Sequence, residues 1–236
     1  MTGIPFGADA TGARSRPRAI LFDWDNTLVD SWATIHEALN FVMDAMGKPV
    51  WSLADTQARV RLSLRESFPI HFGERWEEAR AIYLDRFQEI HLERLKPLPG
   101  REAMLRSLVE QGIFLGVVSN KTGAFLRREV ACLGWSGFFG SIIGAGDAAA
   151  DKPASEPVHL ALAPSGIPAG QDVWFVGDTS IDMECARNSG CVGVLLGDAL
   201  PADEFARFAP QLAFADEATL FRSVEGLRFD AARPSS

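Results

Sequence analysis

Two aspartates one residue apart, Asp23 and Asp25, directly follow the apolar segment Ala19–Phe22. Such a segment is typical of a buried strand, and open sheets of parallel strands place their reactive groups at the carboxyl ends of the strands. Because an isolated buried carboxylate costs several kcal/mol, two of them at one strand end require a cation or a reaction to explain them. The pair therefore predicts an active site.

Polar side chains also follow the other apolar segments of the chain. They are Ser119 and Asn120 after residues 113–118, Lys152 in the loop after residues 141–143, and Asp178 and Asp182 after residues 173–176. In a parallel sheet these ends lie on one edge, so we expect the separated motifs to converge in space. We expect a helix to begin at about Asp178, which would place Asp178 and Asp182 on one helix face.

The residue types at these strand ends specify a reaction. The four aspartates have a formal charge of −4, of which Lys152 can offset one unit and a divalent cation two. Mg²⁺ prefers one or two carboxylates, several waters and a substrate phosphate oxygen. The hydroxyl of Ser119 and the ammonium of Lys152 suit the oxygens of a phosphoryl group. We therefore predict Mg²⁺-assisted phosphoryl transfer with a carboxylate nucleophile.

The elements that would position these groups alternate between strand and helix. Apolar segments predict strands at 19–22, 113–118, 141–143, 173–176 and 192–195, and helical patterns lie at 100–111, 122–133 and 156–163. This alternation is typical of an α/β fold with a doubly wound parallel sheet.

Residues 31–98 interrupt the alternation. They contain no convincing strand but show helical spacing of apolar residues, most clearly at 32–46 and 76–95. We expect an all-helical cap inserted above the carboxyl ends of the sheet. The predicted organisation is an α/β core at 18–30 and 99–225, a helical cap at 31–98, and flexible tails at 1–17 and 226–236.

Composition limits the partners and the compartment. A formal net charge of −8 argues against nucleic acid, which normally requires clustered Lys and Arg. No stretch approaches the roughly 18 consecutive apolar residues of a membrane-spanning helix, and the first 18 residues lack the apolar region of a signal peptide. Three cysteines without CxxC spacing suit a reducing compartment. We predict a cytoplasmic protein without a membrane partner, either a monomer or a homodimer.

The motifs together resemble the haloacid dehalogenase-like superfamily, and its phosphoglycolate-phosphatase-like branch in particular. The family's DxDxT motif matches Asp23–Thr27, its Ser or Thr after an apolar strand matches Ser119, its lysine matches Lys152, and its GDxxxD motif matches Gly177–Asp182. Asn26 stands where many relatives have Gly. The resemblance covers residues 19–196 and implies a Rossmann-like core with a C1 helical cap.

The resemblance also implies a role for each matched residue. Asp23 would attack phosphorus and form an aspartyl-phosphate, and Asp25 would protonate the leaving alcohol and then activate water. Ser119 and Lys152 would hold the phosphoryl oxygens. Metal ligation would fall to four residues, Asp23, Asp25 through its backbone carbonyl, Asp178, and Asp182, the last supporting the metal shell or the lysine.

The substrate is expected to be a small phosphorylated metabolite, with phosphoglycolate as the first choice by family analogy. Thr27 and Asn120 within the motifs, and Arg61 and Arg65 in the predicted cap, are the expected substrate-binding residues. The four histidines have no metal-ligand spacing and are expected to be ordinary surface or satisfied polar residues.

Several alternatives share parts of this pattern. A sugar-phosphate phosphomutase would share every motif. A phosphonate hydrolase would use a cap lysine, for which Lys48 is the candidate. A dehalogenase is disfavoured because that branch lacks the second aspartate, here Asp25. A non-enzymatic phospho-receiver has a similar residue set but is about half this length and lacks the helical insertion.

Overall fold

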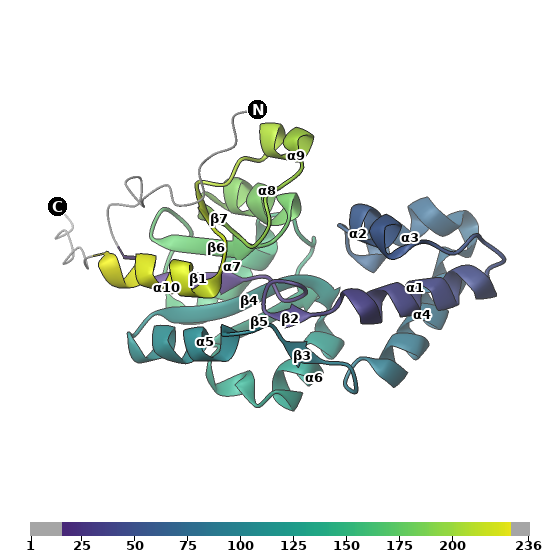
Figure 1. The fold of residues 1–236 in the computed structure, drawn as a ribbon, viewed down its shortest axis with the longest axis horizontal. Coiled ribbons are helices and arrows are strands. Elements are labelled where there is room, and N and C mark those ends of the chain that lie inside the picture. Colours follow the sequence, from purple (N-terminus) through teal and green to yellow (C-terminus); the bar gives the residue numbers. More distant parts are fainter. Residues whose placement is uncertain (1–15, 228–236) are drawn as a thin grey trace.

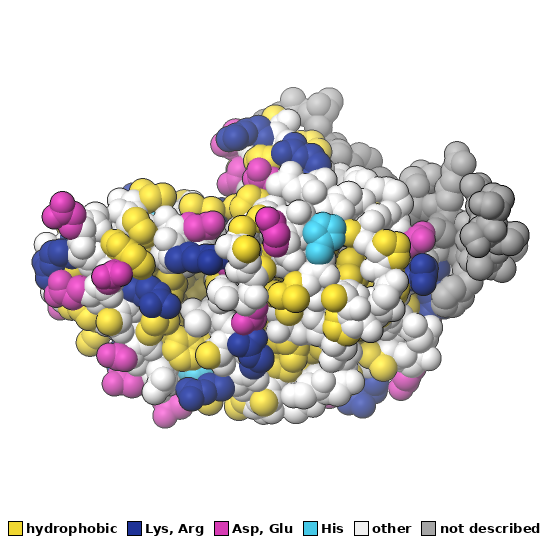
Figure 2. Space-filling view, turned by 180° about the vertical axis from the view of Figure 1, so that it is seen from behind, with side chains coloured by type: hydrophobic (Ala, Val, Ile, Leu, Met, Phe, Trp, Pro, Cys, Tyr) yellow, Lys and Arg dark blue, Asp and Glu magenta, His cyan; other side chains and the backbone are white. Residues whose placement is uncertain are grey.

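The computed structural model describes residues 16–227. The tails predicted at 1–17 and 226–236 fall largely on residues outside this range. Among the described residues, no helix combines the length and the apolar composition needed to cross a membrane. Figure 2 shows acidic and basic side chains interspersed on one face of the molecule.

A six-stranded parallel sheet forms the centre of the molecule, in the order β5-β4-β1-β6-β7-β8 (Figure 1). The strands are β1 (Ala19–Phe22), β4 (Phe114–Thr122), β5 (Ser141–Ala145), β6 (Val173–Gly177), β7 (Val192–Leu196) and β8 (Leu212–Phe214). The structure confirms the predicted doubly wound parallel sheet and adds β8, which the sequence analysis missed.

Helices cover both faces of this sheet. They are α5 (Arg101–Glu110), α6 (Gly123–Cys132), α7 (Glu156–Leu162), α8 (Ser180–Ser189), α9 (Ala202–Arg207) and α10 (Glu217–Gly226). Ile20 and Phe22 pack in a cluster with residues of α5, α6 and α10, whereas Ala19 and Leu21 pack with residues of α7 and α8. Because β1 is buried on both faces, its sequence is continuously apolar.

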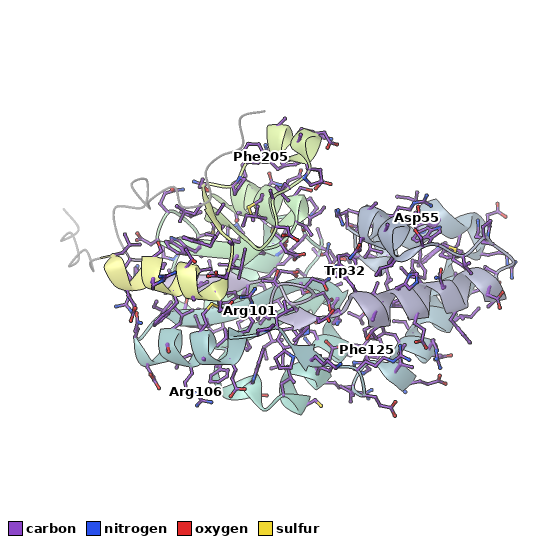
Figure 3. The ribbon with its side chains drawn as sticks, viewed as in Figure 1. Trp32, Asp55, Arg101, Arg106, Phe125 and Phe205 are labelled. Atoms are coloured by element: carbon purple, nitrogen blue, oxygen red, sulfur yellow. The ribbon has the colours of Figure 1, made fainter. Side chains whose placement is uncertain are left out.

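The helical insertion between β1 and β4 forms a hydrophobic cluster of its own. Its elements are α1 (Trp32–Ala45), α2 (Leu53–Arg59), α3 (Leu64–Phe72), a short 3₁₀ turn (Gly73–Arg75) and α4 (Trp76–Ile90). Phe125 of α6 packs into this cluster from the sheet side. Figure 3 shows Trp32 and Phe125 at the junction between the insertion and the sheet.

A two-stranded antiparallel ribbon joins the points where the chain enters and leaves the helical insertion. Its strands are β2 (Val29–Asp30) and β3 (Lys96–Pro97), with Val29 opposite Pro97. The expectation of no strand within residues 31–98 was therefore wrong at its C-terminal end. The sequence gives no local signal for β3 because the strand is two residues long and contains a proline.

Candidate active site

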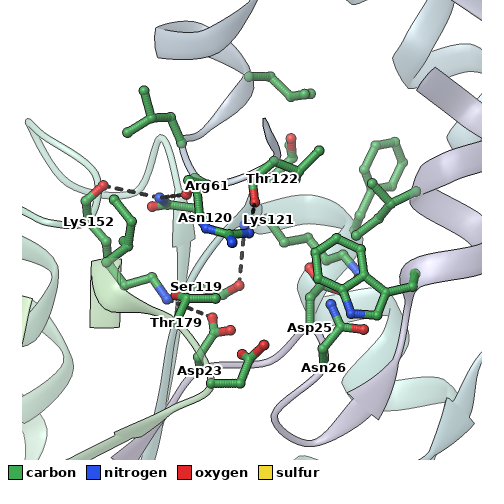
Figure 4. Close-up of a pocket in the computed structure, with 18 of the residues that line it drawn as sticks. Asp23, Asp25, Asn26, Arg61, Ser119, Asn120, Lys121, Thr122, Lys152 and Thr179 are labelled. Carbon is green, nitrogen blue, oxygen red and sulfur yellow. Dashed lines mark hydrogen bonds and ion pairs between the residues drawn. The ribbon is translucent and has the colours of Figure 1, made fainter. Parts of the chain in front are cut away.

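Four neighbouring strands of the sheet, β5, β4, β1 and β6, bring the predicted motifs to one edge. Asp23 directly follows β1, and its backbone N–H donates to the carbonyl of Val176 on β6 at 2.8 Å. Ser119 lies near the end of β4, and Lys152 follows β5. All of these residues except Val176 line a single cavity of about 120 Å³ (Figure 4).

Lys152 connects two of the aspartates. Its ammonium lies 2.6 Å from Asp23 Oδ1 and 2.7 Å from Asp182 Oδ1, and its side chain is 3% exposed. Burial by itself lowers the pKa of Lys152, but the charges of Asp182 and Asp23 outweigh this effect and hold the pKa above its usual value. The lysine therefore stays charged between the two carboxylates.

Helix α8 begins two residues later than the sequence analysis expected. Thr179 is the N-cap residue, and its backbone N–H and hydroxyl donate to Asp182 Oδ2 at 3.0 and 2.7 Å. Asp178 precedes the helix, so the prediction that Asp178 and Asp182 share a helix face was wrong. Asp178 instead lies in the turn between β6 and α8, where it also borders the cavity.

The carboxylates form an acidic group that suits a cation. One oxygen from each of Asp23, Asp178 and Asp182 can be chosen so that all lie within 4.8 Å of one another. Burial, together with the charge of Asp182, raises the pKa of Asp23 to about 6 despite the opposing effect of Lys152. Burial and the charges of Asp182 and Asp23 also raise the pKa of Asp178 well above its usual value. A bound divalent cation would relieve this repulsion, and oxygen ligands are those that Mg²⁺ prefers.

Two further residues of the first motif, Asn26 and Thr27, shape the site. Thr27 is fully buried, does not line the cavity, and donates its hydroxyl to Asp178 Oδ1 at 2.8 Å. Asn26 has a φ of 61°, a conformation that glycine adopts freely and asparagine tolerates. Asparagine is therefore compatible with the backbone at this position of the motif.

Asp25 faces a buried network that the sequence analysis missed. Lys121 Nζ lies 2.6 Å from Asp25 Oδ1 and 2.8 Å from Glu129 Oε2. Glu129 also accepts from Trp24 Nε1 at 2.7 Å and lies 2.9 Å from His91 Nδ1. The sequence could have indicated that Glu129 is unusual, because a charged residue stands on the apolar face of α6. It contains no local pattern that pairs Glu129 with residues so distant in the chain. His91, expected to be an ordinary surface or satisfied polar residue, is buried in this network and contacts Glu129 through Nδ1.

The predicted substrate-binding residues lie in different places. Asn120 and Arg61 line the cavity; Asn120 donates to the carbonyl of Lys152 at 3.1 Å, and Arg61 lies 3.7 Å from the carboxylate of Glu204. Arg65 is not among the residues that line the cavity. It donates to the buried carboxylate of Asp151 at 2.5 Å and so joins α3 to the loop that carries Lys152.

Apolar side chains from the helical insertion complete the cavity opposite the carboxylates. They include Trp32, Ile35, Val60, Leu62, Leu64, Tyr83 and Phe87. Lys48, the lysine considered for a phosphonate hydrolase, does not line the cavity, and its ammonium lies 5.8 Å from the centroid of the Phe72 ring. The geometry therefore gives no support to Lys48 as the cap lysine of a phosphonate hydrolase.

Comparison with known proteins identifies the family. Residues 20–195 match the family model described as haloacid dehalogenase-like hydrolase. A protein named phosphoglycolate phosphatase from Xanthomonas campestris is 30% identical over 210 residues, which cover 83% of this chain and 95% of that protein.

Solved structures show the same architecture. A HAD-superfamily hydrolase from Ehrlichia chaffeensis is 29% identical, with a TM-score of 0.61 over 89% of this chain and 97% of the other. A structure described as a predicted phosphatase from Clostridium acetobutylicum has a TM-score of 0.79 at 21% identity, covering 90% of this chain and all of the other. The chain belongs to the haloacid dehalogenase-like hydrolase family, in its phosphoglycolate-phosphatase-like branch.

Proposed function

We propose that this hydrolase is a Mg²⁺-dependent phosphatase that cleaves a small phosphomonoester through an aspartyl-phosphate on Asp23. The observation that carries the proposal is the position of Lys152, whose ammonium contacts Asp23 at 2.6 Å beside a cavity that Ser119 also lines. A nucleophilic carboxylate, a fixed cation and a hydroxyl at one point are the groups that phosphoryl transfer requires.

The reaction has two steps. A carboxylate oxygen of Asp23 attacks phosphorus, the bond from phosphorus to the ester oxygen breaks, and Asp25 gives its proton to the departing alcohol. Asp25 then takes a proton from a water molecule, whose oxygen attacks phosphorus and releases Asp23 and inorganic phosphate. Ser119 and Lys152 hold the phosphoryl oxygens throughout.

The donor set indicates how the proposed Mg²⁺ would be held. Both oxygens of Asp182 already accept hydrogen bonds, Oδ1 from Lys152 and Oδ2 from Thr179. In contrast, Oδ2 of Asp23 and Oδ2 of Asp178 accept no hydrogen bond from the described part of the chain. We assign ligation to Asp23, Asp178 and the backbone carbonyl of Asp25, with Asp182 orienting Lys152. When bound, the cation neutralises charge on the phosphoryl oxygens.

The substrate proposal rests on the relatives and on the cavity. The named relative acts on phosphoglycolate, and Arg61 and Asn120 are polar groups that line the cavity near Ser119. We propose that these two side chains contact the leaving group, that Thr27 supports Asp178, and that Arg65 fixes the loop of Lys152. A small phosphorylated metabolite as the partner and a cytoplasmic location remain predictions.

Phosphate release from purified protein tests this function. We expect wild type to hydrolyse p-nitrophenyl phosphate and phosphoglycolate, EDTA to stop both reactions, and added Mg²⁺ to restore them. Asp23→Asn should abolish turnover, whereas the control Asp85→Asn, at an exposed position on α4, should not change it. Substantial turnover by Asp23→Asn, or activity that persists in EDTA, would show that the proposal is wrong.

A further inference from the structure

A group of four buried side chains adjoins Asp25, and the proposed reaction does not use it, although Lys121 also lines the cavity. The group, here called the Glu129 network, consists of Trp24, His91, Lys121 and Glu129. The side chains of His91, Lys121 and Glu129 are 1%, 5% and 2% exposed. Burying charged groups this deeply is costly, and a buried ion pair can often be replaced by apolar residues without loss of stability. Stability alone therefore does not explain why these charged side chains are buried together.

The geometry of the network points to Asp25. Lys121 contacts only one carboxylate oxygen of Asp25, Oδ1, at 2.6 Å. Oδ2 of Asp25 accepts no hydrogen bond from the residues that the structure describes, and Asp25 lines the cavity. One oxygen is thus anchored, which leaves the other for the substrate.

Glu129 holds Lys121 in this position. A lysine side chain has several rotatable bonds, and a single contact with Asp25 would leave it free to take other rotamers. The second contact, with Glu129 Oε2 at 2.8 Å, restricts the ammonium further. Glu129 is fixed in turn by Trp24 from the first motif and by His91, which directly follows the last residue of α4.

We propose that Glu129 and Lys121 are positioning residues that hold Asp25 for proton transfer to the leaving oxygen, with His91 and Trp24 fixing Glu129. This inference rests on the proposed phosphatase function. The network would act in one step, the departure of the alcohol. In that step the proton of Asp25 moves to the ester oxygen while the bond between phosphorus and that oxygen breaks.

The assignment makes a prediction that depends on the leaving group. An alkyl alkoxide leaves poorly and needs the proton, whereas 2,4-dinitrophenolate leaves without one. A misplaced general acid should therefore slow alkyl phosphates far more than 2,4-dinitrophenyl phosphate. Misplacement of a catalytic group by about 1 Å costs up to about 100-fold in rate, so we expect a differential loss of about 10- to 100-fold.

The test compares Glu129→Gln with wild type on phosphoglycolate and 2,4-dinitrophenyl phosphate. The quantity measured is kcat/KM, which reports the steps up to release of the alcohol. Glu129→Gln keeps the size of the side chain and removes its charge, and Glu110→Gln on the exposed end of α5 is the matched control. His91→Phe removes the ring nitrogen that contacts Glu129 and tests the same chain of contacts one step further away.

The outcomes separate the inference from the function on which it rests. We expect Glu129→Gln and His91→Phe to lose about tenfold or more in kcat/KM on phosphoglycolate relative to 2,4-dinitrophenyl phosphate. Equal losses on both substrates, or no loss in Glu129→Gln, would overturn the inference and leave the phosphatase function intact. A wild-type protein inactive on both substrates would instead overturn the proposed function, and the inference with it.

Discussion

Replacing Lys152 by methionine should destabilise the metal-free protein strongly. The lysine ammonium lies 2.6 Å from Asp23 and 2.7 Å from Asp182, and the side chains of the two carboxylates are 10% and 1% exposed. Lys152→Met keeps most of the volume of the side chain but leaves both carboxylates without their cation. Its main effect is therefore electrostatic.

The expected size of the effect follows from the burial of the pair. Breaking a buried ion pair by removing one partner costs about 3–5 kcal/mol, because an uncompensated charge remains in a poorly solvated place. The loss should shrink as the pH falls, since the pKa of Asp23 is already about 6 with the lysine present and protonation removes its charge. Added Mg²⁺ should also reduce the loss.

Urea unfolding in EDTA, followed by tryptophan fluorescence, measures this loss at pH 7.5 and at pH 5. The double variant Lys152→Met/Asp23→Asn should recover part of the loss, because it removes one of the two uncompensated charges. Lys48→Met, at an exposed position in the helical insertion, is the control and should change the free energy of unfolding by less than about 0.5 kcal/mol.

A loss in Lys152→Met below about 1 kcal/mol would contradict the expected cost of an unpaired buried charge. An equal loss at pH 5 and pH 7.5, or no recovery in the double variant, would also contradict it. Any of these three results would mean that Lys152 does not compensate buried carboxylates.

Three further predictions follow from single contacts. Burial raises the pKa of Asp23 to about 6 from its ordinary value of 3.8, so the unfolding free energy in EDTA should fall as the pH rises through that interval. Asp23→Asn should lack this fall and, by circular dichroism melting at pH 7, gain up to about 3 kcal/mol. Arg65→Met removes the guanidinium bound to buried Asp151 and should cost about 1–3 kcal/mol in urea unfolding; an unchanged midpoint would show that this contact contributes nothing. Gly177→Ala would place a Cβ 2.2 Å from Cγ of Asp182, so it should cost about 1–3 kcal/mol and lower phosphate release, and a fully active variant would contradict the packing.

The sequence predicted those parts of the fold that continuous apolar segments encode. Strands such as Val173–Gly177 are buried on both faces, so every residue is apolar or small and the pattern is unambiguous. Strand Leu212–Phe214 has three residues and lies at the edge of the sheet, next to β7 only. The pairing of Val29 with Pro97 joins residues on either side of the helical insertion, and no local pattern encodes it.

At the site, too, the sequence predicted what strand ends bring together and missed what tertiary packing brings together. Asp23, Ser119 and Lys152 were predicted to meet because parallel strands place their carboxyl ends on one edge. The position of Asp178 outside α8 was missed, since a threonine N-cap at the next residue shifts the helix start. The contact between Lys121 and Asp25 spans 96 positions, and that between His91 and Glu129 spans 38, so only tertiary packing reveals them.

Identification of the phosphorylated residue is the sharpest test of the aspartyl-phosphate mechanism. Wild-type protein would be mixed with Mg²⁺ and excess phosphomonoester, quenched in acid during turnover, digested, and mapped by mass spectrometry. The proposed mechanism requires one acid-stable, hydroxylamine-sensitive phosphoryl group on Asp23, which disappears when substrate is exhausted. Turnover with no phosphoryl group on Asp23, or with the group on another residue, would contradict it.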